Sequence, residues 1–271
     1  MKKLLKFIVF IFAVYVFFYV NNHWIVTTEH TYESEKVPAS FDGYRITQVT
    51  DLHDATFGDK QQNLVEKVRA TNPDAIFITG DLVDSRRYNL QNSLQAVEQF
   101  VDFADVYYVL GNHEVALNNM EEIYAALSEL GVRVLPNEAV VFERDGERLA
   151  IAGIEDPLMG QTVPAMLDEA IGSVVDDTFT MLLSHRPEQF DSYINQEIDL
   201  VFTGHAHGGQ IRLPFIGGLF APSQGMLPPY TAGVFEEDET TMYVGRGLGN
   251  SIFPFRIFNL PEIVTVELHS K

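Results

Sequence analysis

The chain has 271 residues, of which 46% are hydrophobic, and its formal net charge is −20 at pH 7. It contains no cysteine, which excludes disulfides and thiolate metal sites, so any bound metal must be held by nitrogen and oxygen ligands. The strong negative charge repels phosphate backbones, and we therefore expect no nucleic acid partner. The length fits one globular domain of roughly 230 residues after an apolar N-terminal run.

Residues 4–20 form an apolar run that Lys2 and Lys3 precede and that Lys6 and two tyrosines interrupt. A helix of this length just spans a bilayer core, and its basic flank predicts a cytoplasmic N-terminus with the domain outside. We expect a retained single-pass anchor over residues 1–22, because no small-x-small cleavage pattern follows the run. A cleaved signal peptide, with secretion of the domain, is the alternative. The polar residues 27–40 predict a tether, so residues 23–43 are expected to be a tether and entry strand before a domain at 44–271.

The first half of the domain alternates β-prone segments with segments of helical periodicity, which is typical of an α/β sheet. We predict strands over residues 44–50, 74–79, 106–110, 132–135, 139–143, 148–152, 179–184 and 199–203. Helices are predicted over residues 63–70, 90–103, 120–130 and 164–171, and from Pro187 onward. After residue 203 the sequence favours strands and loops, with strands at 234–237, 241–245 and 263–268.

Five of these strands are followed at once by polar residues that can bind metals or carry protons. Each residue has a structural alternative, such as a helix N-cap for Asp51 or a turn for Asp81. Their joint placement favours a functional site, because sites in α/β sheets form at the carboxyl ends of strands. The set is Asp51, His53, Asp81, Asp84, Asn112, His113, His185, His205 and His207.

This set offers more oxygen and imidazole ligands than one ion can use, so we predict two bound ions. Mixed oxygen and imidazole ligands suit Mn²⁺, Fe²⁺ or Zn²⁺ better than Ca²⁺ or Mg²⁺. Two such ions can clamp an in-line displacement at phosphorus and lower the pKa of a shared water.

The motifs resemble those of the calcineurin-like metallophosphoesterases, and they occur in the same order. They are Asp51-x-His53, Gly80-Asp81-x-x-Asp84, Gly111-Asn112-His113-Glu114, His185 and Gly204-His205-x-His207. The resemblance runs from about residue 44 to the C-terminus and implies an α/β fold, a two-sheet β-sandwich flanked by helices.

The resemblance also implies roles for individual residues. The first metal would be bound by Asp51, His53, Asp81 and His207. The second would be bound by Asp81, Asn112, His185 and His205, with Asp81 bridging the two ions. His113 would stabilise the transferring phosphoryl group or protonate the leaving oxygen, and Asp84 would orient His113 by accepting from its other ring nitrogen.

Residues 184–187 and 204–235 are similar to a membrane-associated branch of that family, which includes enzymes similar to UDP-2,3-diacylglucosamine pyrophosphatases and cell-envelope phosphodiesterases. An outward-facing domain fits an envelope lipid or wall phosphate better than a cytoplasmic nucleotide-linked precursor. The resemblance therefore implies a dinuclear metal-dependent phosphoesterase, in which a metal-bound hydroxide attacks a phosphodiester or pyrophosphate of a membrane or envelope substrate. The alternatives are a non-catalytic metal-binding scaffold at the membrane, a phosphomonoesterase and a nuclease.

Substrate contacts are less well marked. Arg86, Arg87 and Arg246 are candidate phosphate contacts, while Glu114 is expected to have a supporting or structural role. Five apolar residues after the last metal motif could line a groove for an acyl chain or could be core residues: Phe215, Ile216, Leu219, Phe220 and Met226. The sequence gives no prediction of the oligomeric state.

Overall fold

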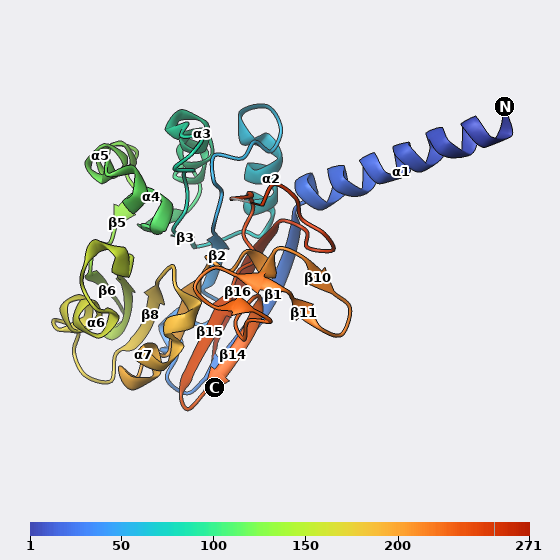
Figure 1. The fold of residues 1–271 in the computed structure, drawn as a ribbon. Coiled ribbons are helices and arrows are strands. Elements are labelled where there is room, and N and C mark those ends of the chain that lie inside the picture. The colour runs from blue at the N-terminus through green and yellow to red at the C-terminus, as the bar shows by residue number, and fades with distance from the viewer. Residues whose placement is uncertain (252) are drawn as a thin grey trace.

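The computed structural model describes residues 1–251 and 253–271, and it contains two mixed β-sheets of six strands each (Figure 1). In spatial order the first sheet is β1 (Val26–Ser34), β16 (Glu262–Ser270), β2 (Arg45–Val49), β3 (Ala75–Thr79), β4 (Asp105–Val109) and β5 (Arg133–Val134). The second is β14 (Gly233–Glu237), β15 (Thr240–Val244), β9 (Leu200–Thr203), β8 (Phe179–Leu183), β7 (Glu147–Gly153) and β6 (Glu138–Arg144).

The helices form the outer layers (Figure 1). The first sheet is covered by α2 (Gln62–Ala70), α3 (Leu90–Phe100) and α5 (Met120–Glu129), with the short α4 (Asn112–Leu117) after β4. The second sheet is covered by α6 (Val163–Ile171) and α7 (Phe190–Asn195). Two short hairpins, β10 (Arg212–Leu213) with β11 (Gly217–Gly218) and β12 (Phe220–Ala221) with β13 (Gly225–Met226), lie between β9 and β14.

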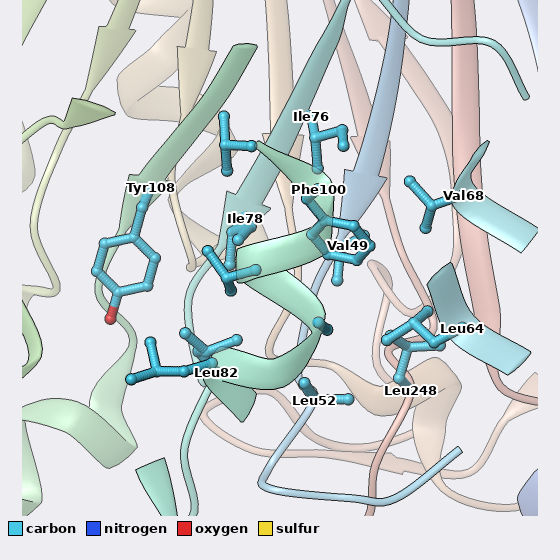
Figure 2. Packing of buried hydrophobic residues seen from close by; sticks show 14 of the residues in the cluster. Val49, Leu52, Leu64, Val68, Ile76, Ile78, Leu82, Phe100, Tyr108 and Leu248 are labelled. Carbon is cyan, nitrogen blue, oxygen red and sulfur yellow. The ribbon is translucent and has the colours of Figure 1, made fainter. Parts of the chain in front are cut away.

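Successive side chains of the central strands point alternately to the helices and to the other sheet, which explains the layers. In β3, Ile76 and Ile78 face the helices, where Figure 2 shows them beside Phe100 of α3. Ala75 and Phe77 of the same strand face the other sheet, and the ring of Phe77 lies 5.1 Å from that of Phe202. Because a strand buried on both faces must be apolar on both, β3 reads as a continuous apolar run in the sequence. The predicted α/β sandwich of two sheets flanked by helices is confirmed.

The strand β1 lies within residues 23–43, where a tether and entry strand were expected, and it occupies the first part of the polar stretch 27–40 that was expected to be a tether. It pairs in parallel with β16 at the edge of the first sheet. An edge strand with one solvated side does not need an apolar sequence, so hydropathy alone misses it. Its β-branched residues and Tyr32 favour an extended conformation, and the ring of Tyr32 packs 5.8 Å from that of Phe179.

We expect a chain that begins at Glu35 to be less stable than one that begins at Ile25. The shorter chain leaves the nine-residue ladder of β16 without its partner and removes the packing of Tyr32. The loss should exceed about 3 kcal/mol, or roughly 10 °C in Tm for a domain of this size. Thermal unfolding followed by circular dichroism measures it, and equal Tm values for the two chains would contradict the role given to β1.

Helix α1 (Lys2–His23) carries the apolar N-terminal run, and its apolar side chains are largely exposed. Among the described residues it is the one helix long and apolar enough to cross a membrane. Figure 1 shows it projecting from the body, with only its C-terminal end against the rest of the chain.

Candidate metal centre

The predicted site residues come together where the parallel strands of both sheets end. Asp51 and His53 follow β2, Asp81 and Asp84 follow β3, and Asn112 and His113 open α4 directly after β4. His185 follows β8 in the second sheet, and His205 and His207 follow β9. All of them are buried except Asn112, which is partly buried. The carboxyl ends of strands from both sheets therefore supply a single cluster of polar side chains.

Five of the seven expected metal ligands have left-handed backbones, with φ of 51° at Asp51, 49° at His53, 50° at Asp81, 65° at His205 and 48° at His207. Such a conformation costs a non-glycine residue about 1–3 kcal/mol and persists only where the surrounding structure enforces it. Strain of this kind, concentrated on one cluster, is typical of a functional site.

Four side chains make up the first group of potential ligands: Asp51, His53, Asp81 and His207 offer one atom each, all within 4.8 Å of one another. The Nε2 atoms of His53 and His207 face each other at 3.1 Å. His53 Nε2 lies 3.5 Å from Asp81 Oδ2, and His207 Nε2 lies 3.5 Å from Asp51 Oδ1. Two ring nitrogens and two carboxylate oxygens therefore converge on one point.

A second group shares Asp81 with the first and adds His185 and His205. His185 Nε2 lies 3.2 Å from Asp81 Oδ2 and 3.2 Å from His205 Nδ1. Nearby in the chain, Asn112 Oδ1 is buried without a hydrogen-bond partner among the described residues. Asp81 Oδ2 thus lies between His53 of one group and His185 of the other.

The protonation states fit metal ions. Burial lowers the pKa of His53 to about 3 and holds the pKa values of His205 and His207 well below the ordinary value, so these rings are neutral. A neutral ring keeps a lone pair on one of its nitrogens, and in this cluster that lone pair is available to a positive partner. A divalent cation supplies that partner, and the nitrogen and oxygen donors suit Mn²⁺, Fe²⁺ or Zn²⁺.

Hydrogen bonds from outside the cluster fix the ligands. Glu114 accepts from the backbone amides of Asp81, Val83 and Gly111 at 3.0, 3.2 and 2.8 Å, which ties the loop after β3 to the loop after β4. His185 Nδ1 lies 2.9 Å from the carbonyl oxygen of Thr79. Donation to that carbonyl leaves His185 Nε2 directed at Asp81, the usual arrangement for a metal-ligating histidine.

The hydrogen-bond partner of His113 is Ser85 rather than the expected Asp84. Its Nδ1 accepts from the backbone amide of Ser85 at 3.0 Å, so its Nε2 carries the proton and lies 3.0 Å from the Ser251 hydroxyl. Asp84, expected to orient this ring directly, instead accepts from the amides of Arg86 and Arg87 at 2.8 and 3.1 Å. The short turn after β3 explains the difference, because the Asp84 carboxylate folds back onto that turn and presents the next amide, Ser85, to the ring.

The structure adds a buried ion pair that the sequence analysis did not identify. Arg186 Nη2 donates to Asp156 Oδ1 at 2.9 Å, and Arg186 Nη1 lies 2.8 Å from the outer ring nitrogen of His205. Ser223 accepts from the same Nη1 at 2.9 Å. Asp156 and Ser223 are distant in the chain from the metal motifs, so no local pattern points to them.

The three arginines expected to contact phosphate lie in different places. Arg87 lines a cleft of about 600 Å³ that His53 also lines. Arg246 pairs with Glu262 at 2.9 Å and lines a different cavity, so it lies outside that cleft, and the side chain of Arg86 is exposed.

The expected apolar groove after the last metal motif also lies elsewhere. Phe215, Ile216, Phe220 and Met226 are exposed around the hairpins β10–β11 and β12–β13, and Leu219 is partly buried. None of the five lines the cleft beside His53.

We expect metal binding to release protons. Burial alone would lower the pKa of His185, but the Asp81 carboxylate outweighs burial and raises this pKa to about 10, so the metal-free ring is protonated at neutral pH. A ligating ring must be neutral, so its proton is released, and apparent affinity should rise about tenfold per pH unit between about pH 6 and 8. Below about pH 6 the dependence should steepen, because burial raises the pKa of Asp51 to about 6.

Titration calorimetry in buffers of different ionisation enthalpy counts the released protons. The His185→Asn variant should release one proton fewer than the unaltered chain. Affinity that does not change with pH would contradict the protonated His185–Asp81 pair.

Comparison with known proteins agrees with this geometry. Residues 44–209 match the calcineurin-like phosphoesterase family. The metallophosphoesterase YkuE of Bacillus subtilis is 29% identical over 259 residues, 93% of this chain and 88% of that protein. The phosphodiesterase YaeI of Escherichia coli is 28% identical over 232 residues, 83% of this chain and 82% of YaeI.

A vertebrate relative is longer. The transmembrane protein with metallophosphoesterase domain of Danio rerio is 31% identical over 250 residues, 86% of this chain but 55% of that protein, so the chain spans about half of it. The family match covers more than half of this chain and contains every motif of the two ligand groups. The chain belongs to the calcineurin-like phosphoesterase family.

Proposed function

We propose that this chain is a membrane-anchored hydrolase of phosphodiester or pyrophosphate bonds that works with two divalent transition-metal ions. The observation that carries the proposal is the position of Asp81 Oδ2, 3.5 Å from His53 Nε2 and 3.2 Å from His185 Nε2. A carboxylate between two ligand groups can bridge two ions. When bound, such a pair supplies Lewis acidity and neutralises the charge that develops in an in-line displacement at phosphorus.

Each ligand group would hold one ion. The first would use Asp51, His53, Asp81 and His207, and the second Asp81, Asn112, His185 and His205. The buried, unpartnered Oδ1 of Asn112 and the neutral rings of His53, His205 and His207 support this division.

The remaining polar residues would act on the substrate. As the oxygen of a water molecule bonds to phosphorus and the ester P–O bond breaks, His113 Nε2 gives its proton to the leaving oxygen, and the proton that the water loses returns the ring to its neutral form. Asp84 acts as a positioning residue, because it holds the turn that presents the Ser85 amide to His113. Arg87, which lines the cleft with His53, contacts the phosphate oxygens.

Helix α1 and its charges support a catalytic domain outside the cytoplasm. Lys2, Lys3 and Lys6 lie at the free end of the helix, so the positive-inside rule puts that end in the cytoplasm and the catalytic domain outside. A membrane or cell-envelope phosphoester is then within reach, and the net charge of −20 disfavours nucleic acid. The name of YaeI supports a diester rather than a monoester substrate.

The test is hydrolysis of bis-p-nitrophenyl phosphate and p-nitrophenyl phosphate by the full chain in detergent, metal-free and with Mn²⁺ or Zn²⁺. The full chain keeps both β1, which belongs to the first sheet, and the membrane helix α1. We expect metal-dependent cleavage with the diester preferred. Cleavage of neither ester by the folded, metal-loaded chain would contradict a general phosphodiesterase, and a monoester preference would contradict the substrate class.

A further inference from the structure

The cleft of about 600 Å³ joins two different environments. His53 of the first ligand group and Arg87 line it. Phe18 and Tyr19 of the membrane helix α1 and Phe255 line it as well. A molecule that fills the cleft therefore meets a metal-binding ring, a guanidinium group and an aromatic wall.

Helix α1 is fixed to the loop that also reaches the catalytic histidine. Asn22 Oδ1 accepts from Asn250 Nδ2 at 2.7 Å, and Asn21 Oδ1 lies 3.3 Å from the backbone amide of Asn259. The hydroxyl of Ser251, next to Asn250, lies 3.0 Å from the proposed proton donor. The end of the membrane helix is thus held in place relative to the metal centre.

The length of α1 sets the depth of the cleft in the bilayer. A hydrocarbon core of about 30 Å needs about 20 helical residues at 1.5 Å each. Helix α1 has 22 residues, so nearly its whole length is required to span, including Tyr15, Phe18 and Tyr19 of the cleft wall. The cleft must therefore open where the membrane helix leaves the bilayer.

The loop beside α1 has the composition of a membrane-contacting surface. The ring of Phe18 packs 5.2 Å from that of Phe255, and Phe17 packs 5.2 Å from Phe258. Yet Phe255 and Phe258 remain 47% and 60% exposed. Exposed apolar rings next to a membrane helix are stabilised when they insert at the boundary between lipid headgroups and acyl chains.

From this we infer that the substrate is a lipid-linked phosphoester, whose apolar chain lies against Phe18, Tyr19 and Phe255 while its phosphorus reaches the metal centre. The inference rests on the proposed phosphoesterase activity and assigns the membrane helix to the substrate site. The substrate enters sideways from the bilayer. This route also suits a chain of net charge −20, which repels anions arriving from solution.

Two diesters with the same reactive phosphorus test the inference: methyl p-nitrophenyl phosphate and dodecyl p-nitrophenyl phosphate. With the metal-loaded full chain in nanodiscs, we expect kcat/KM for the dodecyl ester to exceed that for the methyl ester at least about tenfold. Phe18→Ala and Phe255→Ala should each lower this ratio severalfold, because each removes apolar contact with the chain. Phe10→Ala is the matched control on the same helix, since Phe10 is exposed and does not line the cleft.

If the methyl ester is cleaved but the dodecyl ester has no advantage, the inference is wrong while the proposed function stands. The same holds if Phe10→Ala lowers the ratio as much as Phe18→Ala. If neither ester is cleaved, the proposed function fails, and a second measurement still tests the position of the cleft.

That measurement is fluorescence quenching by brominated phospholipids. Trp24 is the only tryptophan, so Trp24→Phe gives a silent background for Phe255→Trp. We expect strong quenching of this variant in vesicles. Val175→Trp is the control, because Val175 is exposed after α6, and Figure 1 shows α6 on the side away from α1. Equal, weak quenching at both positions would overturn the inference.

Discussion

Replacing Asp81 by alanine is expected to abolish phosphoesterase activity, with a fall in kcat/KM of at least about a thousandfold. Asp81 belongs to both ligand groups, so its loss would remove a ligand from each of the two proposed ions and the negative charge between them. Two bound metal ions supply several kcal/mol of charge stabilisation in the transition state. Each 1.36 kcal/mol is about tenfold in rate. Metal content per chain and kcat/KM with a soluble diester measure the effect together.

A loss of fold could imitate this result, so the test needs matched variants. Asp81→Asn keeps the shape of the side chain, and its Oδ1 can still accept from the His113 amide at 2.8 Å. It should retain the thermal stability of the metal-free chain but bind fewer than two ions. Asp102→Ala makes the same change at an exposed carboxylate and should leave activity unaltered. Two ions and full activity in Asp81→Asn would refute the bridging role.

The central layers and the ligand groups could be predicted because their determinants are local. Apolar runs such as β3 mark strands buried on both faces. The residue after each run then lies at the carboxyl end of its strand, where sites form. His205 and His207 are recognisable for this reason, although His207 meets Asp51 and His53 from the other sheet. The family resemblance added the division between two ions, which spacing alone leaves open.

What could not be predicted depends on contacts between distant segments. The partners of His113 are Ser85 and Ser251, and neither is marked by its neighbours in the sequence. Arg186 meets Asp156 only because two loops of the second sheet pack together. The strand β1 is polar because its edge is solvated. The apolar wall of the cleft comes from α1 and Phe255 rather than from the apolar residues of the hairpins β10–β11 and β12–β13.

The general-acid role of His113 makes a prediction that separates chemistry from structure. His113→Ala should lower kcat by about 10²–10⁴-fold while both metal ions stay bound, because the ring nitrogens of His113 face Ser85 and Ser251. The hydrogen bond from the His113 backbone amide to Asp81 survives any change of the His113 side chain.

The loss of kcat in His113→Ala should be larger for an alkyl leaving group than for p-nitrophenolate, which leaves without a proton. Ser251→Ala keeps the ring and is expected to change kcat only severalfold. A loss that is the same for good and poor leaving groups, or that comes with loss of metal, would show that His113 supports the site without donating the proton.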